Sequence, residues 1–193
     1  MRIMVTGGAG FIGSHVAEFL LNKGHEPILV DNLSTGKLGN IKHLLKEVEF
    51  VEKKVEDTNL NDFKNIDSII HLAAQASVPL SISDFKQSST TNILSSICIL
   101  DFCAKENIPL VYASSSAVYG EMEVGKDSEE SVDLISPYAV DKYVLELYSL
   151  VLKEIFDLSS IGLRFFNVYG PNEYHKGRMA SVIFSILFVF PYL

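Results

Sequence analysis

Disulfide-rich folds, nucleic-acid surfaces and membrane anchors each require residues that are scarce in this sequence. Its 193 residues include two cysteines, Cys98 and Cys103, and no tryptophan. Two cysteines cannot form a disulfide framework, and their spacing is not that of a metal site, so we expect buried reduced thiols in a cytoplasmic protein. Basic residues are also few: 16 Lys and Arg oppose 24 Asp and Glu, and the net charge of −8 argues against a nucleic-acid partner.

The sequence also shows no pattern of a targeting or membrane-spanning segment. An apolar strand pattern follows Met1 directly, which predicts that there is no signal peptide. The apolar run at residues 182–193 is shorter than the ~20 residues that a membrane-spanning helix needs, so we expect no membrane partner. With 48% hydrophobic and 21% charged residues, the composition is that of a globular protein long enough to bury a sizeable core.

Short apolar runs alternate with segments of helical periodicity along the chain. Strands are predicted at residues 2–5, 26–30, 49–53, 67–72, 108–113 and 159–165. Helices are predicted at residues 11–21, 36–46, 87–106 and 137–155. This alternation predicts an α/β fold built on a Rossmann-type doubly wound parallel sheet, in which a ligand binds at the carboxyl ends of the strands.

A glycine-rich loop, Thr6–Gly13, lies between the first predicted strand and the first predicted helix. In that context Gly7 allows a tight turn, Gly10 lets the backbone approach a pyrophosphate, and Gly13 lets the helix pack close to the strand. The anion would lie on backbone N–H groups at the positive end of the helix. The alternative is a plain turn with no ligand.

Asp31 follows the second predicted strand, at the position where dinucleotide-binding folds bind the adenosine ribose. A carboxylate there accepts hydrogen bonds from both ribose hydroxyls and repels a 2′-phosphate. The residue therefore favours NAD over NADP, although an acidic turn residue is the simpler alternative. Other polar or small residues also follow predicted strands and would meet at the same edge of the sheet: Ala73–Gln75, Ser114–Ser116 and Asn167.

Tyr138 and Lys142 stand four residues apart at the start of the last predicted helix, so both side chains fall on one face. A lysine ammonium close to the phenol would lower the tyrosine pKa from its usual value of about 10, making a general acid and base suited to alcohol–ketone chemistry. The serines at Ser114–Ser116 supply a hydroxyl that orients the substrate oxygen. A surface helix contact is the alternative for the Tyr–Lys pair.

Taken in order, these stretches resemble the extended short-chain dehydrogenase/reductase family, specifically its nucleotide-sugar epimerases and dehydratases. The matching stretches are Thr6–Gly13, Asp31–Gly36, His71–Gln75, Asn92, Ser114–Gly120, Tyr138 with Lys142, and Arg164–Pro171. The resemblance implies NAD as cofactor, a nucleotide-sugar substrate and a reaction through a transient keto-sugar. It assigns residues 1–171 to the NAD-binding Rossmann domain and residues 172–193 to the start of a substrate-binding region.

The resemblance also implies roles for individual residues. Ser115, Tyr138 and Lys142 would be catalytic, and Ser115 and Asn167 would contact the substrate. The cofactor-binding residues would be Gly7, Gly10, Phe11, Ile12, Gly13, Asp31, Asn32, Leu72, Ala73, Ala74, Gln75, Asn92, Tyr138, Lys142 and Phe166. One position departs from the family: Lys54 stands where an Asp near the adenine is usual, and Asp57 is a candidate substitute.

Two subfamilies are resembled at different places. Asp31–Gly36 and the serine loop look like UDP-glucose or UDP-N-acetylglucosamine 4-epimerases. Residues 172–182 look more like ADP-glycero-manno-heptose 6-epimerase, in which the lysine matching Lys176 is a second base; a solvated loop lysine is the alternative. Ser116 and Ala117 stand where 4,6-dehydratases carry an Asp-Glu pair, which disfavours elimination.

The family continues beyond the point where this sequence ends, which leads us to expect a truncated substrate domain. An NAD-binding fragment without turnover is therefore an alternative to an active epimerase. Family members also pair through two helices, which implies a homodimer here through the segments 87–106 and 137–155. Candidate contacts are Ile97, Leu100, Val144 and Leu147.

Overall fold

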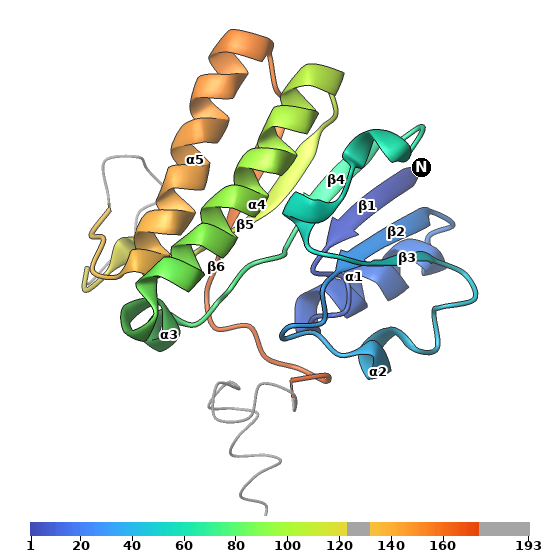
Figure 1. The fold of residues 1–193 in the computed structure, drawn as a ribbon, viewed down its shortest axis with the longest axis horizontal. Coiled ribbons are helices and arrows are strands. Elements are labelled where there is room, and N and C mark those ends of the chain that lie inside the picture. Colours follow the sequence, from blue (N-terminus) through green and yellow to red (C-terminus); the bar gives the residue numbers. More distant parts are fainter. Residues whose placement is uncertain (123–131, 174–193) are drawn as a thin grey trace, which may run out of the picture.

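The computed structural model describes residues 1–122 and 132–173, and within them six strands alternate with helices (Figure 1). The strands are β1 (Arg2–Thr6), β2 (Glu26–Asp31), β3 (Glu49–Glu52), β4 (Ser68–His71), β5 (Leu110–Ser115) and β6 (Ser160–Phe165). The α-helices are α1 (Phe11–Asn22), α2 (Leu38–Ile41), α3 (Val78–Ser83), α4 (Phe85–Glu106) and α5 (Pro137–Phe156). Short 3₁₀ turns are η1 (Val55–Asp57), η2 (Leu60–Asp62) and η3 (Ser116–Tyr119). Lys176 and the apolar run at 182–193 lie outside the described residues.

The strands form one parallel sheet in the order β3-β2-β1-β4-β5-β6. The chain first builds outward from β1 to β3, then returns to the other side of β1 with β4. At this reversal Thr6, the last residue of β1, pairs with Val30 of β2 and His71 of β4. The predicted doubly wound fold is confirmed, and its ligand crevice is expected where the strand order reverses.

Each central strand feeds two hydrophobic cores because its side chains alternate between the faces of the sheet. In β1, Met4 packs into the core beneath α4 and α5, whereas Ile3 and Val5 pack into the core beneath α1 and α2. Figure 1 shows α4 and α5 lying side by side on one face, with α1 on the other. Burial on both faces explains why the central strands read as continuous apolar runs. Within the described residues, no helix is both long enough and apolar enough to cross a membrane.

Two helical segments differ from the sequence prediction. The helix expected at 36–46 is limited to Leu38–Ile41 and continues as turns. The first residues of the predicted helix contact the glycine loop and Asp31 instead. Lys37 donates its N–H to the Ala9 carbonyl at 3.0 Å, and a Cβ at Gly36 would lie 2.9 Å from Asp31 Oδ2. The short helix α3 was not predicted, although Ser77 caps it by accepting the Leu80 N–H at 3.2 Å.

The fifth strand begins and ends two residues later than predicted, at Leu110–Ser115 instead of 108–113. Ser114 and Ser115 therefore belong to the strand, and alternation sends their side chains to opposite faces. Ser114 is buried beneath α5, while Ser115 is only partly buried. Because β5 extends through Ser115, the side chains of Ser114 and Ser115 point to opposite faces, and only one of them can face a ligand.

Candidate active site

The glycine loop turns sharply between β1 and α1. Gly7 has φ +70°, and its N–H donates to the Val30 carbonyl at 2.8 Å. A Cβ at Gly7 would lie 2.9 Å from Ala73 N, and a Cβ at Gly13 would lie 2.1 Å from Gly7 O. Gly10 caps α1 without a side-chain hydrogen bond. The close backbone approach at this turn, at a helix N-terminus, fits a pyrophosphate in shape and in chemistry.

Asp31 lies against this loop with its carboxylate held in place. Its Oδ2 accepts the Ala9 N–H at 2.9 Å and its Oδ1 accepts the Leu33 N–H at 2.8 Å. Each oxygen keeps lone-pair capacity for a further donor. The carboxylate is therefore fixed at the end of β2, beside the phosphate loop, where the proposed ribose hydroxyls require acceptors.

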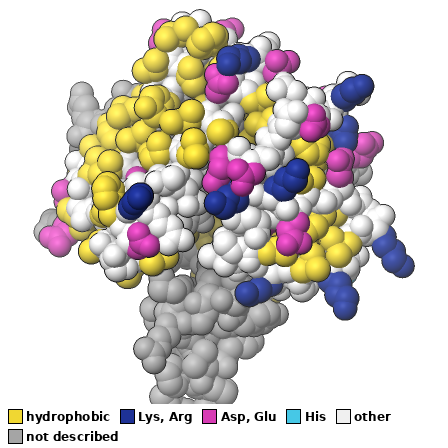
Figure 2. Space-filling model, in the orientation of Figure 1, with side chains coloured by type: hydrophobic (Ala, Val, Ile, Leu, Met, Phe, Trp, Pro, Cys, Tyr) yellow, Lys and Arg dark blue, Asp and Glu magenta, His cyan; other side chains and the backbone are white. Residues whose placement is uncertain are grey.

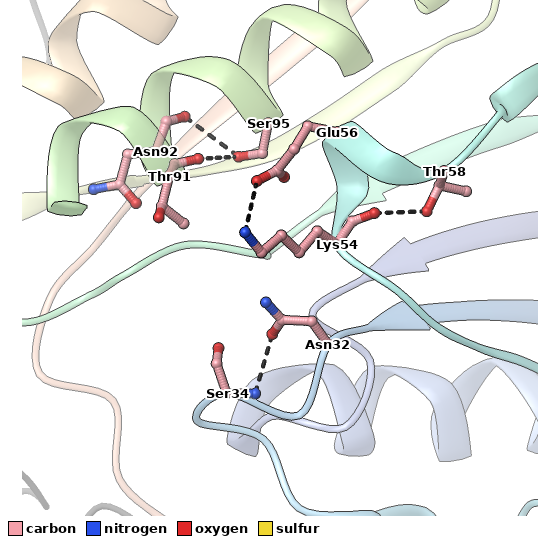
Figure 3. A network of polar contacts seen from close by, with 8 residues as sticks. All are labelled: Asn32, Ser34, Lys54, Glu56, Thr58, Thr91, Asn92 and Ser95. Atoms are coloured by element: carbon pink, nitrogen blue, oxygen red, sulfur yellow. Dashed lines mark hydrogen bonds and ion pairs between the residues drawn. The ribbon is translucent and has the colours of Figure 1, made fainter.

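Lys54 follows β3, as Asn32 and Ser34 follow β2 (Figure 3). Figure 3 shows its ammonium directed toward Glu56, at 4.0 Å from Glu56 Oε1, while Asn32 Oδ1 accepts the Ser34 N–H at 3.0 Å. The side chain of Lys54 is 57% exposed, and Asp57 is exposed in η1. Lys54 thus occupies the position where the family usually carries an Asp near the adenine. Asp57 as a substitute for that Asp stays a prediction.

Tyr138 and Lys142 lie in the first turns of α5, which begins at a Ser136 cap followed by Pro137. Both are buried, at 8% and 5% exposure. Lys142 Nζ lies 5.8 Å from the centre of the Tyr138 ring and donates to the Ala113 carbonyl at 2.8 Å. Ser115 accepts the Ala117 N–H at 3.1 Å and hydrogen-bonds to Tyr138. The structure therefore brings together the phenol, the amine and the hydroxyl that the sequence singled out.

The electrostatics of this cluster differ from the prediction at one point. The expected lowering of the Tyr138 pKa is wrong in this structure: burial raises it, the Ser115 hydrogen bond opposes the rise, and Asp141 adds to it. Lys142 is itself desolvated, and burial lowers its pKa from 10.5 to about 8 while Asp141 acts in the opposite direction. Burial penalises the phenolate, and this cost outweighs the lowering of the Tyr138 pKa that the spacing to Lys142 implied.

Ser114 is committed to a different network. It donates to Glu146 of α5, whose Oε1 and Oε2 accept from Arg164 Nε at 2.9 Å and Arg164 Nη2 at 2.6 Å. The Arg164 guanidinium also lies 4.9 Å from the centre of the Tyr119 ring. Of the two serines in β5, Ser115 is therefore the one placed beside Tyr138.

Asn92 braces the segment after β4 rather than projecting a free amide. Its Oδ1 accepts the Gln75 N–H at 2.8 Å, and its Nδ2 donates to the Gln75 carbonyl at 3.2 Å and to Asp141 Oδ2 at 3.0 Å. Sequence reasoning did not single out Asp141, which is 5% exposed. The sequence signal that could have identified Asp141 is its place directly before Lys142, in the first turns of a helix.

Two predicted residues that follow β6 are not part of this cluster. Phe166 is 68% exposed and stacks on Tyr119 with 6.0 Å between ring centres. Asn167 is exposed after β6. Phe166 and Asn167 therefore lie outside the cluster of Ser115, Tyr138 and Lys142.

Comparison with known proteins gives a consistent picture. A family model described as "NAD dependent epimerase/dehydratase family" matches residues 3–188. The ADP-L-glycero-D-manno-heptose-6-epimerase of Brachyspira hyodysenteriae is 38% identical over 194 residues, which cover 95% of this chain and 60% of that protein.

Solved structures of epimerases share the fold. The UDP-N-acetylglucosamine 4-epimerase from Methanobrevibacter ruminantium, in complex with UDP-N-acetylmuramic acid, has a TM-score of 0.88 at 35% identity, over 94% of this chain and 60% of that chain. The UDP-glucose 4-epimerase of Thermus thermophilus, in complex with NAD, has a TM-score of 0.80 at 39% identity, over 89% and 57%. The chain therefore spans between 57% and 60% of the length of these relatives.

Proposed function

The chain belongs to the NAD dependent epimerase/dehydratase family, and from this premise we propose that it binds NAD and acts in nucleotide-sugar epimerisation. The observation that carries the proposal is that the buried Tyr138 and Lys142 of α5 meet the partly buried Ser115 at the carboxyl end of β5. A plain turn and a surface helix pair, the simpler alternatives for the motifs, do not account for that convergence.

The glycine loop and Asp31 support NAD as the cofactor. The pyrophosphate would lie on the backbone of Gly7–Gly13 at the start of α1, and the adenosine ribose would lie at Asp31. Because the Asp31 carboxylate would repel a 2′-phosphate, affinity for NADP is expected to be at least about tenfold weaker than for NAD. The further cofactor contacts proposed are Phe11, Ile12, Asn32, Leu72–Gln75, Asn92 and Phe166.

Within the proposed reaction, the chain's own residues manage protons and orientation. Bound NAD supplies the acceptor and donor of hydride. Tyr138 Oη would take the proton of a sugar hydroxyl as the hydrogen on the same carbon leaves as hydride, which gives a transient keto-sugar, and would return the proton when the hydride comes back. Ser115 hydrogen-bonds the same oxygen and stabilises the charge that develops there. Lys142 is held close to the phenol by the Ala113 carbonyl, and its ammonium favours the phenolate over the neutral form.

The substrate proposed is a UDP-sugar of the UDP-glucose or UDP-N-acetylglucosamine type, with epimerisation at C4. Asp31–Gly36 and the serine loop support this assignment, and the named 4-epimerases among the similar structures agree with it. ADP-glycero-manno-heptose 6-epimerisation is the second candidate, favoured by the segment around Lys176 and by the Brachyspira hyodysenteriae relative.

Two measurements on the purified chain test the proposal. Calorimetric titration should show NAD binding that Gly13→Ala abolishes, since its Cβ would meet Gly7 O at 2.1 Å. Turnover assays with UDP-glucose, UDP-N-acetylglucosamine and ADP-heptose should show interconversion of one substrate that Tyr138→Phe removes. A folded chain that does not bind NAD would overturn the proposal. NAD binding without conversion of any substrate would instead support a cofactor-binding fragment.

A homodimer is proposed through the outer faces of α4 and α5. Hydrophobic side chains gather over these two helices in Figure 2, among them Ile97, Leu147 and Val151, which are 41%, 43% and 52% exposed. A contiguous apolar patch of this kind is typical of an interaction surface. One predicted contact is wrong: Leu100 is 2% exposed and packs in the core, because it lies on the sheet-facing side of α4.

A further inference from the structure

Four polar residues that the proposed chemistry does not use directly form a buried chain beneath the glycine turn. Thr6, at the end of β1, is 0% exposed and His71, at the end of β4, is 2% exposed. Ser96 and Asn92 of α4 are 8% and 4% exposed. Buried polar groups of this kind need partners, so the direction of each hydrogen bond can be worked out from the donors available.

The hydroxyl of Thr6 constrains the protonation of His71. Thr6 Oγ1 accepts the Ala73 N–H at 3.2 Å and lies 2.7 Å from His71 Nδ1. It also accepts the Leu72 N–H at 3.2 Å, which is shared with the Thr6 carbonyl at 3.1 Å. Backbone N–H groups can only donate, so the one proton of the hydroxyl is available to His71, which favours Nδ1 as an unprotonated acceptor.

The other side of the imidazole agrees with this assignment. Ser96 Oγ lies 2.6 Å from the Asn92 carbonyl, which can only accept, so the serine proton is used there. A lone pair of Ser96 is left facing His71 Nε2 at 3.4 Å, a long hydrogen bond for which Nε2 must be the donor. The network therefore assigns the Nε2–H tautomer.

We propose that His71 is a positioning residue, held as a neutral Nε2–H imidazole that fixes the segment Leu72–Gln75 beside the glycine turn. Through Thr6 it aligns the Leu72 and Ala73 amides, and Ala73 N lies where a Cβ on Gly7 would collide. Through Ser96 it contacts the turn of α4 that carries Asn92, whose side chain holds Gln75 and Asp141. One ring thus joins β1, β4 and α4 at the floor of the crevice.

The surroundings of His71 keep it in this form. Burial and the nearby Lys142 ammonium lower the pKa of His71 from 6.5 to about 3. An imidazolium would also require Nδ1 to donate toward a hydroxyl that already accepts from two backbone N–H groups. The tautomer and the charge state are therefore set by the same contacts.

Nuclear magnetic resonance of nitrogen-15-labelled protein tests the assignment on the wild-type chain. The His71 signal is identified by its loss in His71→Asn, and one protonated and one unprotonated ring nitrogen are expected, with the proton on Nε2 and no titration between about pH 5 and 8. A proton on Nδ1, or a titration in that range, would overturn the proposal whatever the cofactor does.

Two variants test the positioning role. An asparagine side chain can present an acceptor near the position of Nδ1, whereas His71→Phe keeps a ring but offers no acceptor to Thr6. Hydrogen exchange of the Leu72 and Ala73 amides is expected to stay within about threefold of wild type in His71→Asn and to rise at least about tenfold in His71→Phe. Equal exchange in all three proteins would refute the role.

Cofactor affinity gives a further readout that rests on the proposed function. NAD should bind His71→Phe at least about tenfold more weakly than His71→Asn, because the segment beside the pyrophosphate is no longer aligned. Equal affinities of the two variants would count against the positioning role. If wild type did not bind NAD, the proposed function would fail, while the tautomer and exchange measurements would still decide the role of His71.

Discussion

At the scale of single residues, the crevice concentrates groups whose burial carries a desolvation cost. Lys142 is an amine buried to 5% exposure, with the Ala113 carbonyl as its hydrogen-bond acceptor and Asp141 as its neighbour in the chain. Burial lowers its pKa to about 8, so the charged form is harder to hold in the folded protein than in the unfolded chain. Such a site is expected where proton affinity is tuned for chemistry.

The lowered pKa of Lys142 predicts a pH dependence of stability. Between about pH 8 and 10.5 the unfolded chain binds more protons at this lysine than the folded chain, so the free energy of unfolding should rise with pH. Relative to Lys142→Met, wild type should gain about 2 kcal/mol from about pH 7 to pH 10. Urea unfolding of both proteins at each pH measures the difference; a constant difference would contradict the prediction.

Two glycines provide a matched comparison of backbone space. Gly13→Ala would place a Cβ 2.1 Å from Gly7 O, whereas Gly39→Ala meets nothing within 4 Å. We expect Gly13→Ala to lower the free energy of unfolding by about 2 kcal/mol or more. Gly39→Ala should be neutral or stabilising by up to about 1 kcal/mol, since alanine favours helix. Thermal and urea unfolding check both, and equal effects would contradict the packing argument.

At the scale of elements, α5 connects the reactive cluster to the edge of the sheet. Its first turns carry Tyr138 and Lys142, and further along the helix Glu146 pairs with Arg164 of β6 while Ser114 of β5 donates to the same carboxylate. The side chains of Glu146 and Arg164 are 13% and 11% exposed, so water screens this pair little. An ion pair outside the cluster therefore connects α5 to β6.

Breaking this pair from one side should be costly. Arg164→Leu leaves the Glu146 carboxylate buried without its cation, and we expect a loss of about 3 kcal/mol in the free energy of unfolding. The double variant Glu146→Leu with Arg164→Leu should recover most of that loss, because no uncompensated charge remains. Urea unfolding of the single and double variants forms the cycle. A double variant as unstable as the sum of the singles would refute the coupling.

At the scale of the whole molecule, several surfaces expose apolar side chains, and two of them lie on the α5–β6 side of the sheet. One covers α4 and α5 (Figure 2). The other is the face of β6 turned away from α5, where Ile161 and Leu163 are 60% and 41% exposed. On the opposite face of β6, Gly162 lies against Tyr112, and a Cβ there would be 2.6 Å from its ring. Among the described residues, Tyr112 thus packs against one face of β6, while Ile161 and Leu163 on the other face are exposed.

The proposed dimer gives a prediction at this scale. Leu147→Glu should convert a dimer into a monomer, because it places a charge in the centre of the α4–α5 face. Phe19→Glu is the matched control, since Phe19 is 60% exposed on α1, away from that face. Light scattering at tens of micromolar measures the mass. A monomeric wild type, or equal effects of both variants, would contradict the prediction.

Local pattern was enough to predict the fold class and the place of the crevice. The alternation of apolar strands with helices, the glycines of Thr6–Gly13 and the Tyr138–Lys142 spacing are all short-range signals. The roles of the site residues remain predictions, but their meeting at one sheet edge was readable because parallel strands end together.

Long-range contacts settled what periodicity could not. Which serine faces Tyr138 depended on how far β5 stays paired with β6, because pairing through Ser115 puts Ser114 and Ser115 on opposite faces. The pKa of Tyr138 and the tautomer of His71 depended on burial and on partners from β1, β5, α4 and α5. Desolvation and hydrogen-bond saturation arise from the packing of distant segments, so no local stretch of sequence encodes them.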